Sequence, residues 1–376
     1  MQKIGIIAEY NPFHNGHIYH IKKIKELYPD SLLILILNGY FLERGEISVL
    51  SKEAKTKLAL KYNVDIVLEL PVIFGTQSSD TFAEISIKIL QNFQVEEIVF
   101  GSESTNIEKI QKLAKEQLEK RFILEKKDKT QNYPTLLAKT LHIEKAIPPN
   151  DLLAISYTKA ILKNHYPIKT TPILRTSSYH NITSTDTVIS ASNIRHKRKN
   201  HEDIHKYLPT EALNNWQKVD TQKLFELLKY RILTDSHLDT YIDVTEGLDF
   251  KMKKEIKKAK NYEEFLHSLK SKRYTFNRLN RMLIHVLLGH SKKIANIPLS
   301  YIKILGFSKQ GQEYLKEIRK NIQISLTPIK DSIQYQEERK AALLYDMLTN
   351  SHSSFFDIQN KPIIYTKDAS KESNQK

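Results

Sequence analysis

The sequence predicts an α/β fold, with a doubly wound parallel sheet in its first part and a mostly helical, basic second part. Three observations carry this prediction. Short unbroken apolar runs, such as residues 32–37, are typical of strands that helices cover on both faces. These runs alternate with segments of helical apolar spacing, which is the order that builds a parallel sheet. After about residue 200 such runs become scarce, whereas helical spacing continues.

The elements follow from these patterns in chain order. An apolar run at residues 4–8 predicts the first strand, and the spacing of Ile18, Ile21 and Ile24 predicts the helix after it. Further strands are expected at residues 31–37, 64–71, 97–103 and 168–175. Further helices are expected at about 51–62, at 80–92, over much of 108–141, from 152 onward with Asn150 or Asp151 as N-cap, and just after Ser190.

Composition limits the class of protein. The chain of 376 residues has a net charge of +15 and a pI near 9.4, and such an excess of cations commonly signals an anionic partner, with nucleic acid as the first candidate. The absence of cysteine excludes disulfides, thiolate metal sites and an enzyme-bound thioester. The N-terminal apolar run is interrupted by Glu9, and residues 32–37 are too short to span a bilayer. We therefore expect a cytoplasmic protein without membrane association.

The junction of the first strand and helix carries the string EYNPFHNGH at residues 9–17. The first turn of a helix presents unpaired N–H groups and a positive dipole end, which suit a phosphate group. His14 and His17 add two donors on one face, and Gly16 lets a ligand approach the main chain. The string therefore predicts a nucleotide-phosphate site without a Walker lysine or GxGxxG. Metal ligation and ordinary surface positions are the alternatives, although two histidines without a third ligand are weak evidence for zinc.

Residues 14–17 resemble the HxGH signature of the nucleotidyltransferase superfamily, whose members are related to class I aminoacyl-tRNA synthetases. The longer string at residues 9–17 resembles the tRNA(Met) cytidine acetate ligase family, and the likeness covers most of residues 3–195. The string ISASNIR at residues 189–195 resembles the second signature of the superfamily, with serines that can cap a helix. The resemblance implies a Rossmann-like doubly wound sheet of the nucleotidyltransferase type.

The resemblance also implies catalytic roles for His14 and His17, and an ATP site. Gly101 and Arg175 stand at strand ends, where a ring or ribose fits beside glycine and an arginine can pair with phosphate. The alternatives are that Gly101 only ends its strand and that Arg175 is a solvated cation. The expected ATP-binding residues are Ile7, Ala8, Glu9, Tyr10, Asn11, Pro12, Phe13, His14, Asn15, Gly16, His17, Ile18, Tyr19, His20, Gly101, Asn150, Arg175, Ser192 and Arg195.

Three positions depart from the patterns of that family. Asn150 inherits the ATP-binding role of the first Asn in the family's Asn-Asn-Ile-Leu-Gly string, but Asp151 and Ala154 differ from it. In the loop after the second strand, Ile47 replaces a usual proline. Arg44 in that loop is a candidate contact for a substrate anion or tRNA phosphate, and a solvated loop arginine is the alternative.

The excess positive charge is concentrated in one segment. Residues 251–300 contain 13 Lys and Arg against 3 Asp and Glu, which is two thirds of the net charge of the chain. Its centre mixes cations with aromatic residues, which suits phosphates and unpaired bases. The alternative is that these cations form a solvated helix face and that Tyr274 and Phe276 belong to the core. The expected tRNA-binding residues are Lys272, Arg273, Tyr274, Arg278 and Arg281.

These patterns predict an ATP-binding catalytic domain at residues 1–200, a helical tRNA-binding domain at 201–366 and a disordered tail at 367–376. The resemblance implies that acetate attacks the α-phosphate of ATP to give acetyl-adenylate. It also implies that N4 of the wobble cytidine of elongator tRNA(Met) then takes the acetyl group, with Mg2+ expected to assist. Neither a metal site on the protein nor a protein partner is expected. A small-molecule nucleotidyltransferase and a non-catalytic RNA-binding protein are the alternatives.

Overall fold

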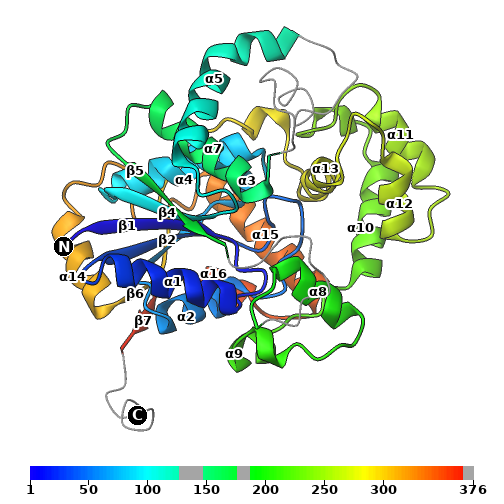
Figure 1. Ribbon diagram of the computed structural model, residues 1–376. Helices are drawn as coiled ribbons and strands as arrows, with labels where there is room; N and C mark the ends of the chain where they lie inside the picture. The colour runs from blue at the N-terminus through cyan, green and yellow to red at the C-terminus, as the bar shows by residue number, and fades with distance from the viewer. Residues whose placement is uncertain (127–146, 176–186, 367–376) are drawn as a thin grey trace.

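The computed structural model describes residues 1–126, 147–175 and 187–366 (Figure 1). The tail predicted to be disordered at 367–376 and the part of the predicted helical segment 108–141 that follows residue 126 lie outside the described residues. None of the described helices is both long and apolar enough to cross a membrane.

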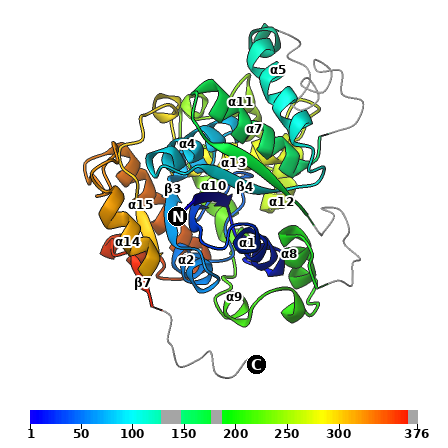
Figure 2. The same ribbon diagram turned by 60° about the vertical axis from the view of Figure 1, so that its left-hand side comes forward.

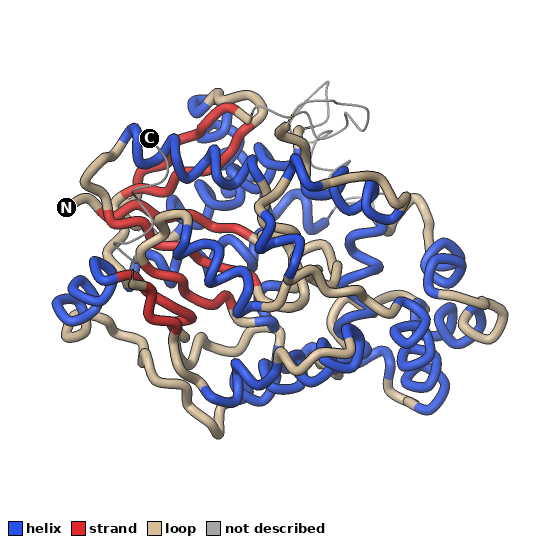
Figure 3. Tube along the Cα trace, turned by 90° about the horizontal axis from the view of Figure 1, so that it is seen from below, coloured by secondary structure: helices blue, strands red, loops and turns tan. Residues whose placement is uncertain are grey.

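A seven-stranded sheet lies toward one side of the described chain, and a group of helices extends to the other side (Figures 1 and 3). Its five predicted strands are all present and lie parallel to one another, as in the pairing of Ile4 with Leu33 and of Ile36 with Leu68. In spatial order the strands are β5 (Lys169–Leu174), β4 (Glu97–Ser102), β1 (Lys3–Ala8), β2 (Leu32–Asn38), β3 (Ile66–Leu70), β6 (Ile304–Ser308) and β7 (Ile363–Tyr365). The prediction of a doubly wound parallel sheet is therefore confirmed.

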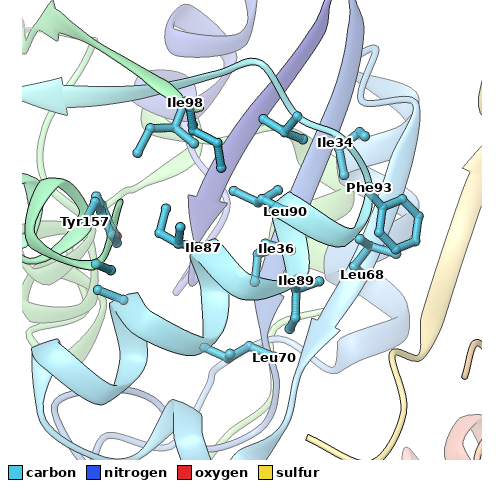
Figure 4. Packing of buried hydrophobic residues seen from close by; sticks show 14 of the residues in the cluster. Ile34, Ile36, Leu68, Leu70, Ile87, Ile89, Leu90, Phe93, Ile98 and Tyr157 are labelled. Carbon is cyan, nitrogen blue, oxygen red and sulfur yellow. The ribbon is translucent and has the colours of Figure 1, made fainter. Parts of the chain in front are cut away.

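Helices cover both faces of this sheet. On one face lie α1 (Asn15–Leu27) and α2 (Lys52–Lys61). On the other lie α4 (Ser79–Asn92), α7 (Pro149–Lys163) and α14 (Lys309–Ile318), with α5 (Ile107–Lys126) packed on α7. Side chains of β2 alternate between two cores: Ile34 and Ile36 pack under α4, and Leu33 and Leu35 face the other way (Figure 4). This double burial explains the unbroken apolar runs of the sequence.

The start of α7 corrects one prediction. Pro148 is its N-cap and Pro149 its first residue, so neither Asn150 nor Asp151 caps the helix. Proline suits this position because its missing N–H would have no partner in a first turn. The Asp151 carboxylate instead accepts hydrogen bonds from the Ser102 hydroxyl and from the backbone N–H of Glu103. The side chain is thus used to fasten α7 to the end of β4.

A helical region, most of which follows β5 in the sequence, has its own apolar core, in which Tyr40, Phe41 and Val72 from the first part also take part. Figure 2 shows these helices from a second direction. The helices of this core are α10 (Thr221–Thr234), α11 (Leu248–Glu255), α12 (Tyr262–Leu269), α13 (Phe276–Leu288) and α15 (Ile333–Thr349). The remaining short helices are α3 (Val72–Gly75), α8 (Ala191–Lys199), α9 (Thr210–Asn214), α16 (Ser354–Gln359) and the 3-10 turns η1 (His205–Tyr207), η2 (Leu238–Thr240) and η3 (Lys292–Ile294).

Segments from beyond residue 300 return to the sheet. β6 pairs antiparallel with β3, and β7 extends the sheet by pairing with β6. These two strands were not expected from the sequence, because each is short and lies among helical patterns. The division into domains at residue 200 stays a prediction, and any catalytic unit built on this sheet includes β6 and β7.

A buried ionic cluster joins these returning segments to the sheet. We define the Lys52 cluster as Lys52, Glu69, Lys303, Glu338 and Asp357. The Lys52 Nζ lies 2.8 Å from Asp357 Oδ1 and 3.1 Å from Glu338 Oε2, and it also pairs with Glu69. Lys303 Nζ lies 2.6 Å from the same Asp357 oxygen. Because the side chains are buried, each charge depends on its partners for stability.

Candidate active site

A cavity of about 250 Å³ opens at the carboxyl ends of β1, β4 and β5, the edge where open α/β sheets bind ligands. The starts of α1, α7 and α8 and the loop after β2 complete its walls. Most of the predicted ATP-binding residues line it, although they come from segments far apart in the sequence. They are Ile7, Ala8, Glu9, Tyr10, Asn11, His14, Gly16, His17, Tyr19, His20, Gly101, Asn150, Arg175, Ser192 and Arg195.

Four predicted residues of the first motif support the cavity from outside its lining: Pro12, Phe13, Asn15 and Ile18. Phe13 is fully buried and packs edge-on against Tyr10, with 4.8 Å between ring centroids. The Asn15 amide donates to the carbonyl oxygens of Thr187 and Lys206, at 3.0 and 2.9 Å. That amide therefore ties α1 to the segments before and after α8. A contact of the four residues with ATP stays a prediction.

The two signature histidines are held by backbone groups of their own turn. His14 is the N-cap of α1, and its Nδ1 accepts a hydrogen bond from the Gly16 N–H at 2.9 Å. The His17 Nδ1 accepts from the His14 N–H at 3.2 Å. Since an acceptor nitrogen carries no proton, the neutral form of each ring has its proton on Nε2. Each ring is thus a fixed Nε2–H donor, and the two ring centroids lie 4.0 Å apart.

Electrostatics keep these rings neutral. Burial lowers the pKa of His14 to about 3, with Arg175 and Arg195 acting in the same direction. Burial, followed by His14, lowers the pKa of His17 well below its ordinary value. Burial and Arg175 lower the pKa of His20 to about 4. At neutral pH the cavity therefore offers neutral imidazole donors, and its fixed positive charge comes from arginines.

Arg175 and Asn150 lie together at the β4–β5 end of the cavity. The Arg175 Nη1 donates to the Asn150 Oδ1 at 3.1 Å, and the Asn150 amide donates to the Glu103 carboxylate. Gly101 lies beside them: a Cβ at this position would stand 3.2 Å from the Arg175 Cγ, closer than a comfortable contact. The missing side chain therefore gives the arginine its space, in addition to any role toward a ligand.

As the sequence predicts, a serine of the second signature caps a helix. Ser190 is the N-cap of α8 and accepts from the Asn193 N–H at 3.3 Å, and its hydroxyl lies 3.0 Å from that of Ser192. Arg195, one turn into α8, reaches across to the first motif. Its Nη1 donates to the Asn11 carbonyl oxygen and its Nη2 to the Glu46 carboxylate, both at 2.6 Å. The two signatures are therefore joined directly at the cavity.

Sequence reasoning did not identify several side chains of this cavity, which include Glu43, Glu46, Phe82, Phe100, Leu153 and Tyr157. The aromatic and leucine side chains form an apolar wall, with the Phe100 and Tyr157 ring centroids 6.2 Å apart. They were missed because aromatic and leucine residues in a helix or strand are ordinary core residues. For the loop after β2, the sequence does predict a ligand contact at Arg44, and this residue lines the cavity.

Lys55 is a buried residue that shapes the same edge of the sheet. Its Nζ donates to the carbonyl oxygens of Glu9, Asn38 and Gly39, at 3.1, 2.6 and 2.6 Å. Burial lowers the pKa of this amine to about 7. The lysine thus ties together the carboxyl ends of β1 and β2. No sequence pattern around Lys55 predicts this role.

The residues predicted to bind tRNA lie on α13 and the loop before it. Arg273 pairs with Glu246, and Arg278 pairs with Asp243 at 3.5 Å while its guanidinium stacks 4.8 Å above the ring of Tyr274. Tyr274 is 7% exposed and belongs to the helical core. The Arg281 side chain is 13% exposed and contacts Glu43 in the loop after β2. Whether these residues and Lys272 bind tRNA stays a prediction.

The fold and the joined signatures define a class of protein. Residues 1–366 match the family described as HIGH Nucleotidyl Transferase, and the chain belongs to it. Within that class it belongs to the tRNA(Met) cytidine acetate ligases. The chain is 36% identical to the protein of that name from Geobacillus sp., with 92% of this chain and 94% of the relative covered. The corresponding Bacillus subtilis protein is 33% identical, with 98% of each chain covered.

Solved structures agree with this assignment. Thermotoga maritima TmcAL in its apo form is 27% identical and superposes with a TM-score of 0.86, covering 97% of this chain and 99% of its own. The same protein bound with alpha-thio ATP superposes with a TM-score of 0.83 over the same shares. The whole described architecture, including the helical region and the late strands, is therefore shared with these structures.

Proposed function

We propose that this protein is an ATP-dependent tRNA-modifying ligase that activates acetate as acetyl-adenylate and acetylates N4 of the wobble cytidine of elongator tRNA(Met). The observation that carries this proposal is the joining of both signatures at one cavity, in a chain that belongs to the tRNA(Met) cytidine acetate ligases over its length. ATP as the activating substrate is supported by the related structure bound with alpha-thio ATP.

The reaction needs two bond exchanges. An acetate oxygen attacks the α-phosphorus of ATP, the bond from that phosphorus to the bridging oxygen breaks, and pyrophosphate leaves. The N4 amine then attacks the acetyl carbon, AMP leaves with the electrons of the broken C–O bond, and the amine loses a proton. Neither step requires an enzyme nucleophile, in keeping with a chain that contains no cysteine.

The chain's own residues supply charge stabilisation for the first step. In phosphoryl and nucleotidyl transfer, negative charge spreads over phosphate oxygens, and fixed donors aimed at it lower the barrier. His14 and His17 provide fixed Nε2–H donors, the first turn of α1 provides backbone N–H groups, and Arg195 provides positive charge. We assign these groups to the triphosphate, and Arg175 with Asn150 to the nucleoside end.

Mg2+ would enter this site with the triphosphate. Among the described residues there is no group of three or more His, Cys, Asp or Glu that could hold a metal ion. Of the carboxylates that line the cavity, Glu46 is engaged by Arg195, and Glu9 accepts hydrogen bonds from Asn38 and from the Glu43 N–H. The ion commonly binds to substrate phosphates with few protein ligands, so the proposal assigns no step to a protein-held metal.

We assign the contact with tRNA to the surface around Lys272, Arg273 and Arg278. The side chains of Arg273 and Arg278 are 27% and 29% exposed, so both guanidinium groups stay within reach of phosphates that compete with their present ion pairs. Replacing the three residues with Gln should weaken tRNA binding and flatten its salt dependence, by roughly 0.7 to 0.9 in the log–log slope for each lost phosphate contact. An unaltered slope would remove this surface from the proposal.

The decisive experiment incubates the protein with ATP, labelled acetate and total tRNA, and then identifies labelled nucleosides after digestion. We expect label in N4-acetylcytidine, with AMP and pyrophosphate released. Label found on AMP but never on tRNA would support a small-molecule nucleotidyltransferase instead. Binding of tRNA without any ATP consumption would support a non-catalytic RNA-binding protein.

A further inference from the structure

The loop at residues 43–46, after β2, lies where the ATP cavity and the helical region meet. Glu43, Arg44 and Glu46 line the cavity, whereas Gly45 packs on α13. Gly45 has a φ of 70°, and a Cβ there would lie 2.3 Å from the backbone nitrogen of Arg281. Only glycine permits this close approach. Figure 1 shows α13 between the sheet and helices α10 to α12.

Arg281 makes the side-chain contact across this junction. Its Nη1 donates to the Glu43 carbonyl oxygen at 3.2 Å and to the Glu43 Oε1 at 3.3 Å, and its Nε lies 3.8 Å from Asp243. The side chains of Arg281 and Glu43 are only 13% and 15% exposed. Little of the guanidinium surface is therefore left for a tRNA phosphate, in contrast to the more exposed Arg273 and Arg278.

The contact continues into the cavity wall. The Glu43 N–H donates to the Glu9 Oε1 at 2.7 Å, and Glu9 stands between β1 and the histidine motif. At the other end of the loop, Glu46 accepts from the Asn11 amide at 3.2 Å and from Arg195. One short loop thus connects α13 with both signatures.

We propose that Arg281 is a positioning residue of the ATP site, contributed by the helical region, which holds loop 43–46 in place against the cavity. The inference rests on the proposed function only for the identity of the ligand as ATP. Removing a charged donor from a nearly buried carboxylate leaves that carboxylate without its partner, so the loop should shift toward water. The expected consequence is weaker ATP binding, with the surface that binds tRNA left intact.

The test measures ATP dissociation constants by calorimetry, together with acetate-dependent ATP–pyrophosphate exchange. We expect Arg281→Gln to raise the dissociation constant and the KM for ATP roughly ten-fold, the effect of one lost charged hydrogen bond, with a smaller change in kcat. Arg281→Lys should recover part of the loss. Gly45→Ala should act in the same direction, because its Cβ would push the loop off α13.

Two comparisons keep this test specific. Arg231→Gln removes an arginine of the same helical region that pairs with Asp235, and it should leave ATP binding unchanged. In a double-mutant cycle, Glu43→Gln and Arg281→Gln should be less than additive, as expected for partners in contact. The salt slope of tRNA binding by Arg281→Gln should equal that of the parent.

The outcomes separate the two proposals. A parent that binds ATP but shows no acetate-dependent exchange would refute the proposed reaction, and ATP binding by the variants would still decide the role of Arg281. An unchanged ATP dissociation constant in Arg281→Gln, a reduced salt slope in that variant, or a parent that does not bind ATP would each overturn the positioning role.

Discussion

We call residues 14–17 at the start of α1 the histidine turn. The histidine turn and the Lys52 cluster are both polar sites on the same sheet, but the residues that interact in them are separated by very different distances along the sequence. In the histidine turn, His14 and His17 are fixed by hydrogen bonds that span two and three residues. In the Lys52 cluster, Lys52 meets Glu338 and Asp357 across 286 and 305 residues. The first site forms with one helix start, whereas the second exists only when the chain has closed. We therefore expect changes in the first to affect chemistry and changes in the second to affect folding.

The largest expected effect is on stability, from Lys52→Met. This change leaves the Glu69 and Asp357 carboxylates buried without their main cation, and breaking a buried pair in this way costs about 3–5 kcal/mol. Urea unfolding measures the loss. Lys57→Met on the same helix is the control, because Lys57 is 61% exposed and its pair with Glu53 contributes at most about 1 kcal/mol. Equal losses in the two variants would contradict the contrast between the sites.

His17→Ala should have the largest effect on activity. Removing one fixed donor to the phosphates is expected to lower acetate-dependent pyrophosphate exchange by about 10²–10³-fold. The urea unfolding midpoint should change little, because the side chain is at a cavity-facing helix start. His201→Ala, an exposed histidine, serves as the control. Unchanged exchange in His17→Ala would remove the central role of the histidine turn.

Arg175→Ala and Asn150→Ala test an interaction of intermediate sequence distance, the hydrogen bond between two residues that are 25 positions apart. We assigned both residues to the nucleoside of ATP. Each variant should weaken ATP binding roughly ten-fold, the scale of one charged hydrogen bond, while tRNA affinity stays the same. Calorimetry with ATP and filter binding with tRNA measure the two affinities. If both affinities fell in parallel, the pair would have a structural role.

The smallest expected effect concerns pH. The pKa of His14 in the folded protein, about 3, lies below its ordinary value of 6.5, so the unfolded chain takes up a proton first as the pH falls. The stabilisation from the neutral ring is complete above pH 6.5 and is lost toward pH 3. Between pH 6.5 and 5.5 one such histidine should cost about 1 kcal/mol of unfolding free energy. His14→Gln should reduce the measured drop by that amount, and an identical drop in both proteins would refute the assignment.

Sequence reasoning succeeded where a residue's role depends on its neighbours in the chain. The five parallel strands, the histidine turn and the cap of α8 by Ser190 were predicted because apolar runs and helix starts are local patterns. It failed at the N-cap of α7, which is Pro148 and not the expected Asn150 or Asp151, because Pro149 already fits the first helical position. It also gave no sign of the antiparallel β6, a five-residue strand whose pairing depends on β3.

The sequence by itself determined the five parallel strands of the sheet, the turn that carries His14 and His17, and the membership in a family whose signatures span few residues. The tertiary structure alone decided the apolar wall around Tyr157, the contact of Arg195 with Asn11, and the contact of Arg281 with Glu43. The physical reason is the range of the interactions. Backbone capping and strand burial depend on neighbouring residues, but ion pairs and cavity walls depend on which distant segments the folded chain brings together.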